Sequence, residues 1–154
     1  MAIEIGQAAP DFTLNDQDNN PVTLSELQGK KVLIYFYPRA STPGCTTQAC
    51  ALRDSKAEFD ALNVVVFGIS PDTPKKLTNF INKQELNFTL LSDEDHATCE
   101  AYNVWQLKKF MGRENMGVMR TSFLITESGN IEHVFNKFKT KDHHEVVLNY
   151  LQSK

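Results

Sequence analysis

VLIYFYPRASTPGCTTQAC, residues 32–50, predicts a buried strand followed directly by a helix. Its first six residues are β-branched, aromatic or leucine without polar alternation, which is typical of an inner strand in a sheet covered on both faces. Pro38 ends that strand. Thr42 has the residue type of a helix N-cap, and Pro43 suits the first helical position, where a missing N–H costs nothing. We therefore expect a helix from Pro43 to about Leu62.

This helix register places Cys45 in the first turn. Backbone N–H groups of a first turn have no partner within the helix, and the positive end of the helix dipole lies there. Both effects favour a thiolate over a thiol, so the pKa of a cysteine in such a position falls below the free value of about 8.5. We interpret Cys45 as a reactive nucleophile, the alternative being a small buried cysteine that follows a turn.

Cys50 lies five residues beyond Cys45. Five residues of helix turn through about 500° and rise about 7.5 Å, which leaves the two Cα atoms about 8–9 Å apart. Because a disulfide needs Cα atoms closer than about 7 Å, a bond between these cysteines requires the first turns of the helix to unwind. The spacing differs from a Cys-x-x-Cys redox motif and is typical of a site that changes shape on oxidation.

The sequence TPGCT at residues 42–46, with Cys50 shortly after it, resembles the active-site signature of the peroxiredoxins. It is most similar to the peroxiredoxin Q group, also called the bacterioferritin comigratory proteins. The resemblance extends along nearly the whole chain, through Gly6, residues 9–12 (APDF), 35–38 (YFYP), 91–93 (LSD) and 117–120 (GVMR).

This resemblance implies a thiol peroxidase that reduces hydrogen peroxide and organic hydroperoxides without a metal or other cofactor. Cys45 would be the peroxidatic cysteine, which peroxide oxidises to a sulfenic acid. Cys50 would be the resolving cysteine, giving an intramolecular Cys45–Cys50 disulfide that thioredoxin reduces. Cys99 is the competing partner, and a part-buried cysteine without a redox role is its simpler interpretation.

Two further residues take catalytic roles from the resemblance. Thr42 is expected to act on the peroxide through its hydroxyl, which can donate and accept hydrogen bonds, whereas a plain N-cap is the simpler interpretation. Arg120 lies within the strand predicted for residues 118–126, where the pattern alone favours an arginine that reaches solvent. In peroxiredoxins the arginine of this motif lies beside the reactive cysteine, where its permanent charge stabilises the thiolate. We therefore expect Arg120 to contact Cys45.

The neighbours of these residues complete the expected site. Pro38, Pro43 and Gly44 are expected to form the peroxide pocket, with first-turn N–H groups donating to the peroxide. Gln48 stands where many peroxiredoxins carry a glutamate that pairs with an arginine. Because glutamine keeps an acceptor but lacks the charge, we expect the site arginine to be held less firmly.

Composition bounds the remaining possibilities. The 154 residues are 41% hydrophobic and 23% charged, as expected for one globular domain that spans residues 1–154. A net charge of −3 gives no reason to expect nucleic-acid or membrane binding. No signal peptide and no apolar run of ~18 residues is visible, so we expect a cytoplasmic protein, and a monomer by resemblance. Three cysteines without metal-ligand spacing predict no metal site.

The rest of the chain predicts an α/β fold. A strand at 64–69 after the Cys45 helix completes a βαβ unit, which implies parallel pairing and a right-handed crossover. The resemblance specifies a thioredoxin-like fold, with a mixed central β-sheet flanked by helices. The other expected elements are a hairpin turned at 15–21, a helical turn from Ser25, a helix from Thr73, a strand at 88–91, a helix near 94–102, a looser stretch from 105 to 110, strands at 118–126 and 131–138, and a helix at 142–152.

Two other functions remain open at this level. A peroxide-sensing redox switch or signalling module would undergo one stoichiometric oxidation without efficient recycling. A general thiol–disulfide oxidoreductase is less favoured, because the Cys-x-x-Cys spacing of that class is absent.

Overall fold

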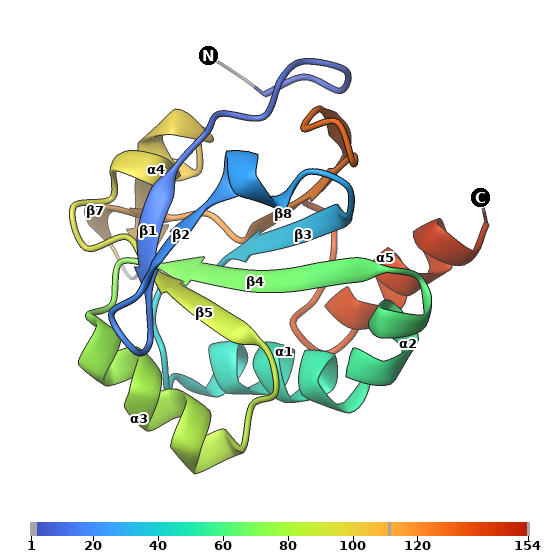
Figure 1. Ribbon diagram of the computed structural model, residues 1–154. Coiled ribbons are helices and arrows are strands. Elements are labelled where there is room, and N and C mark those ends of the chain that lie inside the picture. Colours follow the sequence, from blue (N-terminus) through green and yellow to red (C-terminus); the bar gives the residue numbers. More distant parts are fainter. Residues whose placement is uncertain (1–2, 111, 154) are drawn as a thin grey trace.

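The computed structural model describes residues 3–110 and 112–153, and within them seven strands form one sheet in the order β2-β1-β5-β4-β3-β8-β9 (Figure 1). The strands β3, β4 and β5 run parallel, whereas β8, β9, β1 and β2 add antiparallel pairs. The predicted mixed sheet and its βαβ unit are therefore confirmed. The strands of this sheet are β1 (Thr13–Asp16), β2 (Pro21–Thr23), β3 (Lys31–Phe36), β4 (Val64–Ser70), β5 (Thr89–Ser92), β8 (Thr121–Ile125) and β9 (Ile131–Phe135).

Helices cover both faces of this sheet. Residues of α1, α2, α3 and α5 pack in one core cluster, whereas α4 and a short 3-10 helix, η1, pack in the other (Figure 1). The helical elements are η1 (Leu24–Leu27), α1 (Pro43–Asp54), α2 (Lys56–Ala61), α3 (Pro74–Gln84), α4 (Ala97–Ala101) and α5 (His143–Gln152). No helix in the described part of the chain has the length and apolar character needed to cross a membrane.

The sequence of β3 lacks polar alternation because both faces of this strand are buried. Leu33 and Tyr35 point into the cluster beneath α1 and α5, whereas Val32, Ile34 and Phe36 point into the opposite cluster. All five side chains are at most 2% exposed, so each face of the strand is core. Because both faces of β3 are buried, the end of this strand is held in place, and so is the start of the loop that leads to α1.

Three parts of the fold differ from the sequence-based expectation. The expected long helix is broken at Ser55, whose φ of −100° and ψ of 6° end α1 and start α2. The stretch expected to be loose contains β6 (Trp105–Phe110), which pairs with β7 (Arg113–Val118) in a separate antiparallel hairpin. The strand expected from Val118 starts only at Thr121, because the N–H of Met119 donates to Val104 O at 2.7 Å.

Candidate active site

The loop between β3 and α1 carries the predicted signature. Thr42 occupies the N-cap position, with φ −80° and ψ 156°, and its carbonyl accepts from Thr46 N at 2.8 Å. The Thr42 hydroxyl does not cap the helix, because it donates to Arg39 O at 3.1 Å. The N-cap prediction is therefore correct for the backbone and wrong for the side chain. The hydroxyl instead closes the loop that precedes the helix.

Cys45 lies in the first turn of α1 and is only 1% exposed. The guanidinium of Arg120 donates from Nη2 to Cys45 Sγ at 3.3 Å. The same guanidinium donates from Nη1 to the Oε1 of buried Gln48 at 3.0 Å. The cation thus lies between the sulfur and an amide one turn further along the helix, and whether a glutamate would hold it more firmly stays a prediction. The prediction that Arg120 lies in a strand is wrong, because Arg120 lies in the connection between β7 (Arg113–Val118) and β8 (Thr121–Ile125).

Gly44 is what allows the guanidinium to come this close. A Cβ atom on Gly44 would lie 3.0 Å from Arg120 Nη2, which is tighter than ordinary van der Waals contact. The side chain of Thr140 lies on the same side, 3.6 Å from that position. Glycine is therefore required here by close approach of a neighbouring cation.

Two buried phenols belong to the same core cluster as Cys45. Tyr35 and Tyr37 on the β3 side of the site stack with ring centroids 5.3 Å apart, and both are buried. Burial raises the pKa of Tyr35 well above its ordinary value, and negative charge on Tyr37 or Cys45 raises it further, whereas Arg120 lowers it. Both phenols are consequently neutral at physiological pH, since burial raises the pKa of Tyr37 as well. They contribute no competing negative charge next to Cys45.

A cavity of about 790 Å³ opens beside the loop before α1. Pro38 and Thr42 line it on one side, and the β6–β7 hairpin closes the other, so both residues lie where a substrate could reach them. Of the other two residues expected in the pocket, Pro43 is exposed at the helix start and Gly44 packs against the arginine. The remaining lining residues are Arg39, Pro71, Asp72, Lys76, Trp105, Lys108, Met116, Gly117 and Val118.

Lys108 is a site residue that the sequence does not reveal. It lines the cavity from β6 and lies across Gly117, where a Cβ would be 3.1 Å from its Cδ. Burial lowers the pKa of Lys108, the charge of Arg120 lowers it further, and a thiolate at Cys45 raises it. Lys108 is thus one of three basic residues, with Arg39 and Lys76, that line the cavity. The sequence around Lys108 has no periodicity that would place it there.

The three cysteines are free in this structure and have different surroundings. Cys50 is half-buried, and its Sγ donates to Oε1 of Gln84, the last residue of α3, at 3.6 Å. Cys99 on α4 is fully buried in the core cluster on the opposite face of the sheet from Cys45. Burial and the nearby charge of Asp93 raise the pKa of Cys99, which keeps it a thiol.

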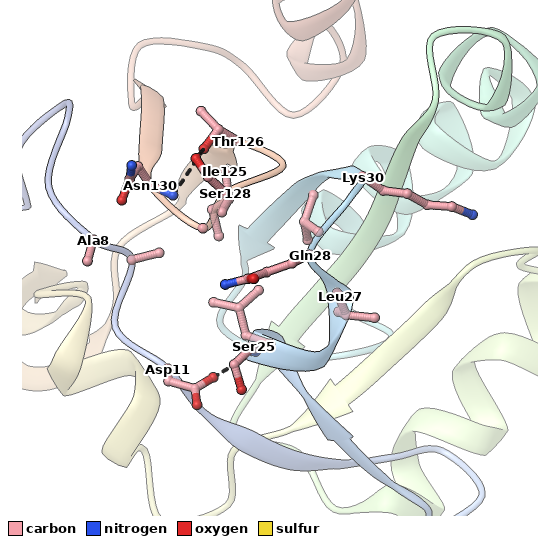
Figure 2. A pocket seen from close by; sticks show the side chains of 14 residues that line it. Ala8, Asp11, Ser25, Leu27, Gln28, Lys30, Ile125, Thr126, Ser128 and Asn130 are labelled. Atoms are coloured by element: carbon pink, nitrogen blue, oxygen red, sulfur yellow. Dashed lines mark hydrogen bonds between the residues drawn. The ribbon is translucent and has the colours of Figure 1, made fainter.

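A second pocket lies at the other end of β3, between η1 and the β8–β9 turn, with a volume of about 190 Å³ (Figure 2). Its polar groups already serve the local backbone: Asp11 accepts from Ser25 N at 2.9 Å, and Thr126 Oγ1 accepts from Asn130 N at 3.1 Å. None of the described residues that line this pocket belongs to the loop before α1 or to α1 itself, whereas Thr42 in the larger cavity is the N-cap residue of the helix that carries Cys45. Within residues 3–110 and 112–153, no cluster of three or more histidine, cysteine or acidic side chains is arranged to hold a metal ion.

Several known proteins are similar to this chain in sequence and in fold. A sequence model of the AhpC/TSA family matches residues 5–134. The chain is 62% identical to a putative peroxiredoxin Bcp of Haemophilus influenzae over 151 residues, which covers 98% of this chain and 97% of that protein. It is 55% identical to peroxiredoxin Bcp of Escherichia coli over 150 residues, 97% and 96% of the two chains. A solved structure of Xanthomonas campestris peroxiredoxin Q superposes with a TM-score of 0.89 at 34% identity, covering 98% of this chain and 96% of that chain.

These similarities extend over almost the full length of the chain and include the residues around Cys45. The α/β architecture is accordingly the thioredoxin-like fold of the peroxiredoxins, as the resemblance implied. The curated relatives are peroxiredoxins, a class of peroxidases. A cysteine at a helix start, in contact with a fixed guanidinium, is the arrangement that such chemistry requires. The chain belongs to the AhpC/TSA family, as a peroxiredoxin of the Bcp, or peroxiredoxin Q, group.

Proposed function

We propose that this thiol peroxidase reduces hydrogen peroxide and organic hydroperoxides through Cys45, resolves the product with Cys50, and is recycled by thioredoxin. The observation that carries the proposal is the 3.3 Å hydrogen bond from Arg120 Nη2 to Cys45 Sγ. A guanidinium beside sulfur favours the thiolate, which is the nucleophilic form. The same cation stabilises negative charge that spreads onto the peroxide oxygens during the reaction.

The first step is attack of the Cys45 thiolate on one oxygen of the O–O bond. An S–O bond forms, the O–O bond breaks, and the leaving hydroxide or alkoxide takes a proton to become water or an alcohol. Cys45 is oxidised to a sulfenic acid, and the peroxide is reduced by two electrons. The N–H groups of Gly44 and Cys45 belong to the first turn, so they have no partner within the helix and are able to hold the peroxide in line.

The second step is attack of Cys50 on the sulfenic sulfur, which forms the disulfide and releases water. Cys45 and Cys50 both lie within the intact helix α1, so this step requires the first turns to unwind and Cys50 to leave Gln84. Burial of Cys99 across the sheet supports Cys50 as the partner. A dithiol reductant of the thioredoxin type then reduces the exposed Cys45–Cys50 disulfide by thiol–disulfide exchange and is itself oxidised to a disulfide.

Organic hydroperoxides are included because of the cavity beside Thr42 and because a relative uses them. The Xanthomonas campestris bacterioferritin comigratory protein has alkyl peroxide reduction activity, and it shares 34% identity with this chain. Pro38, Pro71, Trp105 and Val118 give the cavity here an apolar wall, which suits an alkyl group.

Peroxide-dependent NADPH oxidation with thioredoxin and its reductase tests this function. The wild type should turn over many equivalents of hydrogen peroxide and of an alkyl hydroperoxide, and Cys45→Ser should turn over none. Cys50→Ser should consume one equivalent and then stop or proceed only with an added small thiol. Stoichiometric oxidation of the wild type without turnover would instead favour the redox-switch function.

A further inference from the structure

Asp72 is a buried carboxylate at the edge of the cavity, and the two reaction steps described above give it no role. It lies in the connection between β4 and α3 and is 7% exposed. Its Oδ2 accepts two hydrogen bonds, one from Ala40 N at 2.7 Å and one from Ser70 Oγ at 2.8 Å. A carboxylate with two donors on one oxygen is a strong and directional anchor. One of those donors belongs to the loop that delivers Cys45.

The other connections of Asp72 lead into the central sheet. Its backbone carbonyl accepts from Ser92 Oγ at 2.6 Å, which ties it to β5. Ser70, the last residue of β4, accepts from Asp93 N at 2.8 Å and is fully buried. The carboxylate is therefore held on a rigid support, and the loop residue Ala40 is the part that it restrains.

That loop is held in a conformation that it would not adopt freely. Ser41 has a φ of +66°, in the left-handed region that residues with a Cβ rarely occupy. Such a conformation persists only where the surroundings fix it. The fixing contacts on either side of Ser41 are the Ala40–Asp72 bond and the bond from Thr42 Oγ1 to Arg39 O. Ala40 also packs in the same core cluster as Cys45.

We propose that Asp72 is a positioning residue, which holds the loop 39–42 against the sheet and thereby keeps the first turn of α1 wound around Cys45. This rests on the proposed function, because that function requires the same turn to be wound for attack and unwound for the disulfide. Loss of the anchor favours the unwound form. Cys45 then meets peroxide less often in the reactive geometry, while its sulfenic acid reaches Cys50 sooner.

These two effects have opposite consequences for two measurable products. A sulfenic acid that waits in the wound helix can react with a second peroxide, which breaks another O–O bond and oxidises the sulfur to a sulfinic acid. Early unwinding removes the sulfenic acid from that reaction. Asp72 therefore sets the balance between fast reduction of peroxide and inactivation of Cys45 by excess peroxide.

The test compares Asp72→Ala and Asp72→Asn with the wild type and with Asp93→Ala. Asp93 is a matched control, because it is also a buried carboxylate, accepting from Thr98 N at 3.1 Å and Cys99 N at 2.8 Å, but it anchors α4 on the other face of the sheet. Single-turnover kinetics give the rate constant for Cys45 oxidation, and mass spectrometry gives the sulfinic fraction per turnover at high peroxide. Thermal denaturation reports overall stability for each variant.

Asp72→Ala is expected to slow Cys45 oxidation at least tenfold and to reduce the sulfinic fraction at least threefold. Asp72→Asn should have an oxidation rate and a sulfinic fraction close to those of the wild type, because its amide oxygen can still accept from Ala40 N. Asp93→Ala should lower the denaturation temperature without moving either quantity. Ser70→Ala, which removes one bond that orients Asp72, should shift both quantities in the same direction as Asp72→Ala by a smaller factor, and it serves if Asp72→Ala does not fold.

An oxidation rate and a sulfinic fraction in Asp72→Ala equal to those of the wild type would overturn the proposal. Equal shifts in Asp93→Ala would also overturn it, because they would show a general effect of stability. Failure of the proposed function is a separate result, since it would appear as a wild type that forms no Cys45–Cys50 disulfide.

Discussion

Arg120 Nη2 lies 3.3 Å from Cys45 Sγ, while Nη1 of the same guanidinium lies 3.0 Å from Gln48 Oε1. Both acceptors are on α1 and are only 1% exposed, so one planar cation joins two points of the helix start. This geometry uses the fixed fork of arginine, which lysine does not possess. The same guanidinium therefore contacts both the reactive sulfur and a residue in the next turn of the helix.

Replacement of Arg120 tests what its contact with the sulfur contributes to the oxidation of Cys45. Arg120→Met removes the charge, and we expect the second-order rate of Cys45 oxidation to fall about 30- to 160-fold, as for loss of a charge-assisted bond of about 2–3 kcal/mol in a buried site. Arg120→Lys should recover only part of the rate, because one ammonium cannot reach both the sulfur and the amide. Stopped-flow kinetics measure the rate, and a Met variant with the wild-type rate would contradict the assigned role.

Gly44→Ala should displace the guanidinium without removing it. The added Cβ would lie 3.0 Å from Arg120 Nη2, so the cation must move by a few tenths of an ångström or more. We expect oxidation to slow about tenfold, because charge stabilisation depends on the position of the donor. Asp54→Ala, at an exposed position at the far end of the same helix, is the control and should leave the rate unchanged. Equal rates in both variants would mean that the close approach has no importance.

Lys108 supplies a smaller electrostatic effect from across the cavity. It lines the cavity beside Thr42, and burial and the charge of Arg120 both lower its pKa. Lys108→Met should slow Cys45 oxidation about three- to tenfold at low salt, and Lys108→Arg should restore it. Raising the ionic strength should reduce the difference between wild type and Lys108→Met. A difference that does not change with salt would indicate packing and not charge.

His143 should make stability depend on pH. Burial lowers its pKa from 6.5 to about 3, with the charge of His144 acting in the same direction, while its Nε2 lies 2.6 Å from Ser122 Oγ. Below pH 6.5 the unfolded chain binds a proton that the folded protein excludes, so this contribution to stability is complete above pH 6.5 and is lost as the pH falls toward 3. The slope approaches about 1.4 kcal/mol per pH unit.

Urea denaturation at pH 7, 6 and 5 measures this dependence. His143→Gln keeps a hydrogen-bonding group near Ser122 but does not titrate, so its free energy of unfolding should fall less steeply with acid than that of the wild type. Parallel curves for the two proteins would contradict a neutral His143 in the folded state.

The parts of the fold that the sequence predicts are those fixed by local signals. The continuous apolar run of β3 reflects burial on both faces, and the Thr-Pro pair before Cys45 marks the start of α1. Both signals lie within a few residues of the feature that they specify. The position of Cys45 in a first turn therefore follows from the sequence alone.

The remaining features depend on contacts between distant segments. The β6–β7 hairpin escapes sequence-based prediction because most of its described side chains are exposed or half-buried on both faces, which leaves no alternation to detect. The sequence places Arg120 in a strand because the backbone contact between Met119 and Val104 has no sequence signal. The anchor from Asp72 to Ala40 joins residues 32 positions apart, and only the folded sheet brings them together.

In the proposed mechanism, peroxide oxidises Cys45, which then forms a disulfide with Cys50 through unwinding of α1. One equivalent of hydrogen peroxide, followed by disulfide mapping by mass spectrometry on the wild type and on Cys50→Ser, tests it most directly. We predict a Cys45–Cys50 disulfide in the wild type and a sulfenic acid at Cys45 in Cys50→Ser. A Cys45–Cys99 disulfide, or a Cys45 that does not react, would contradict this mechanism.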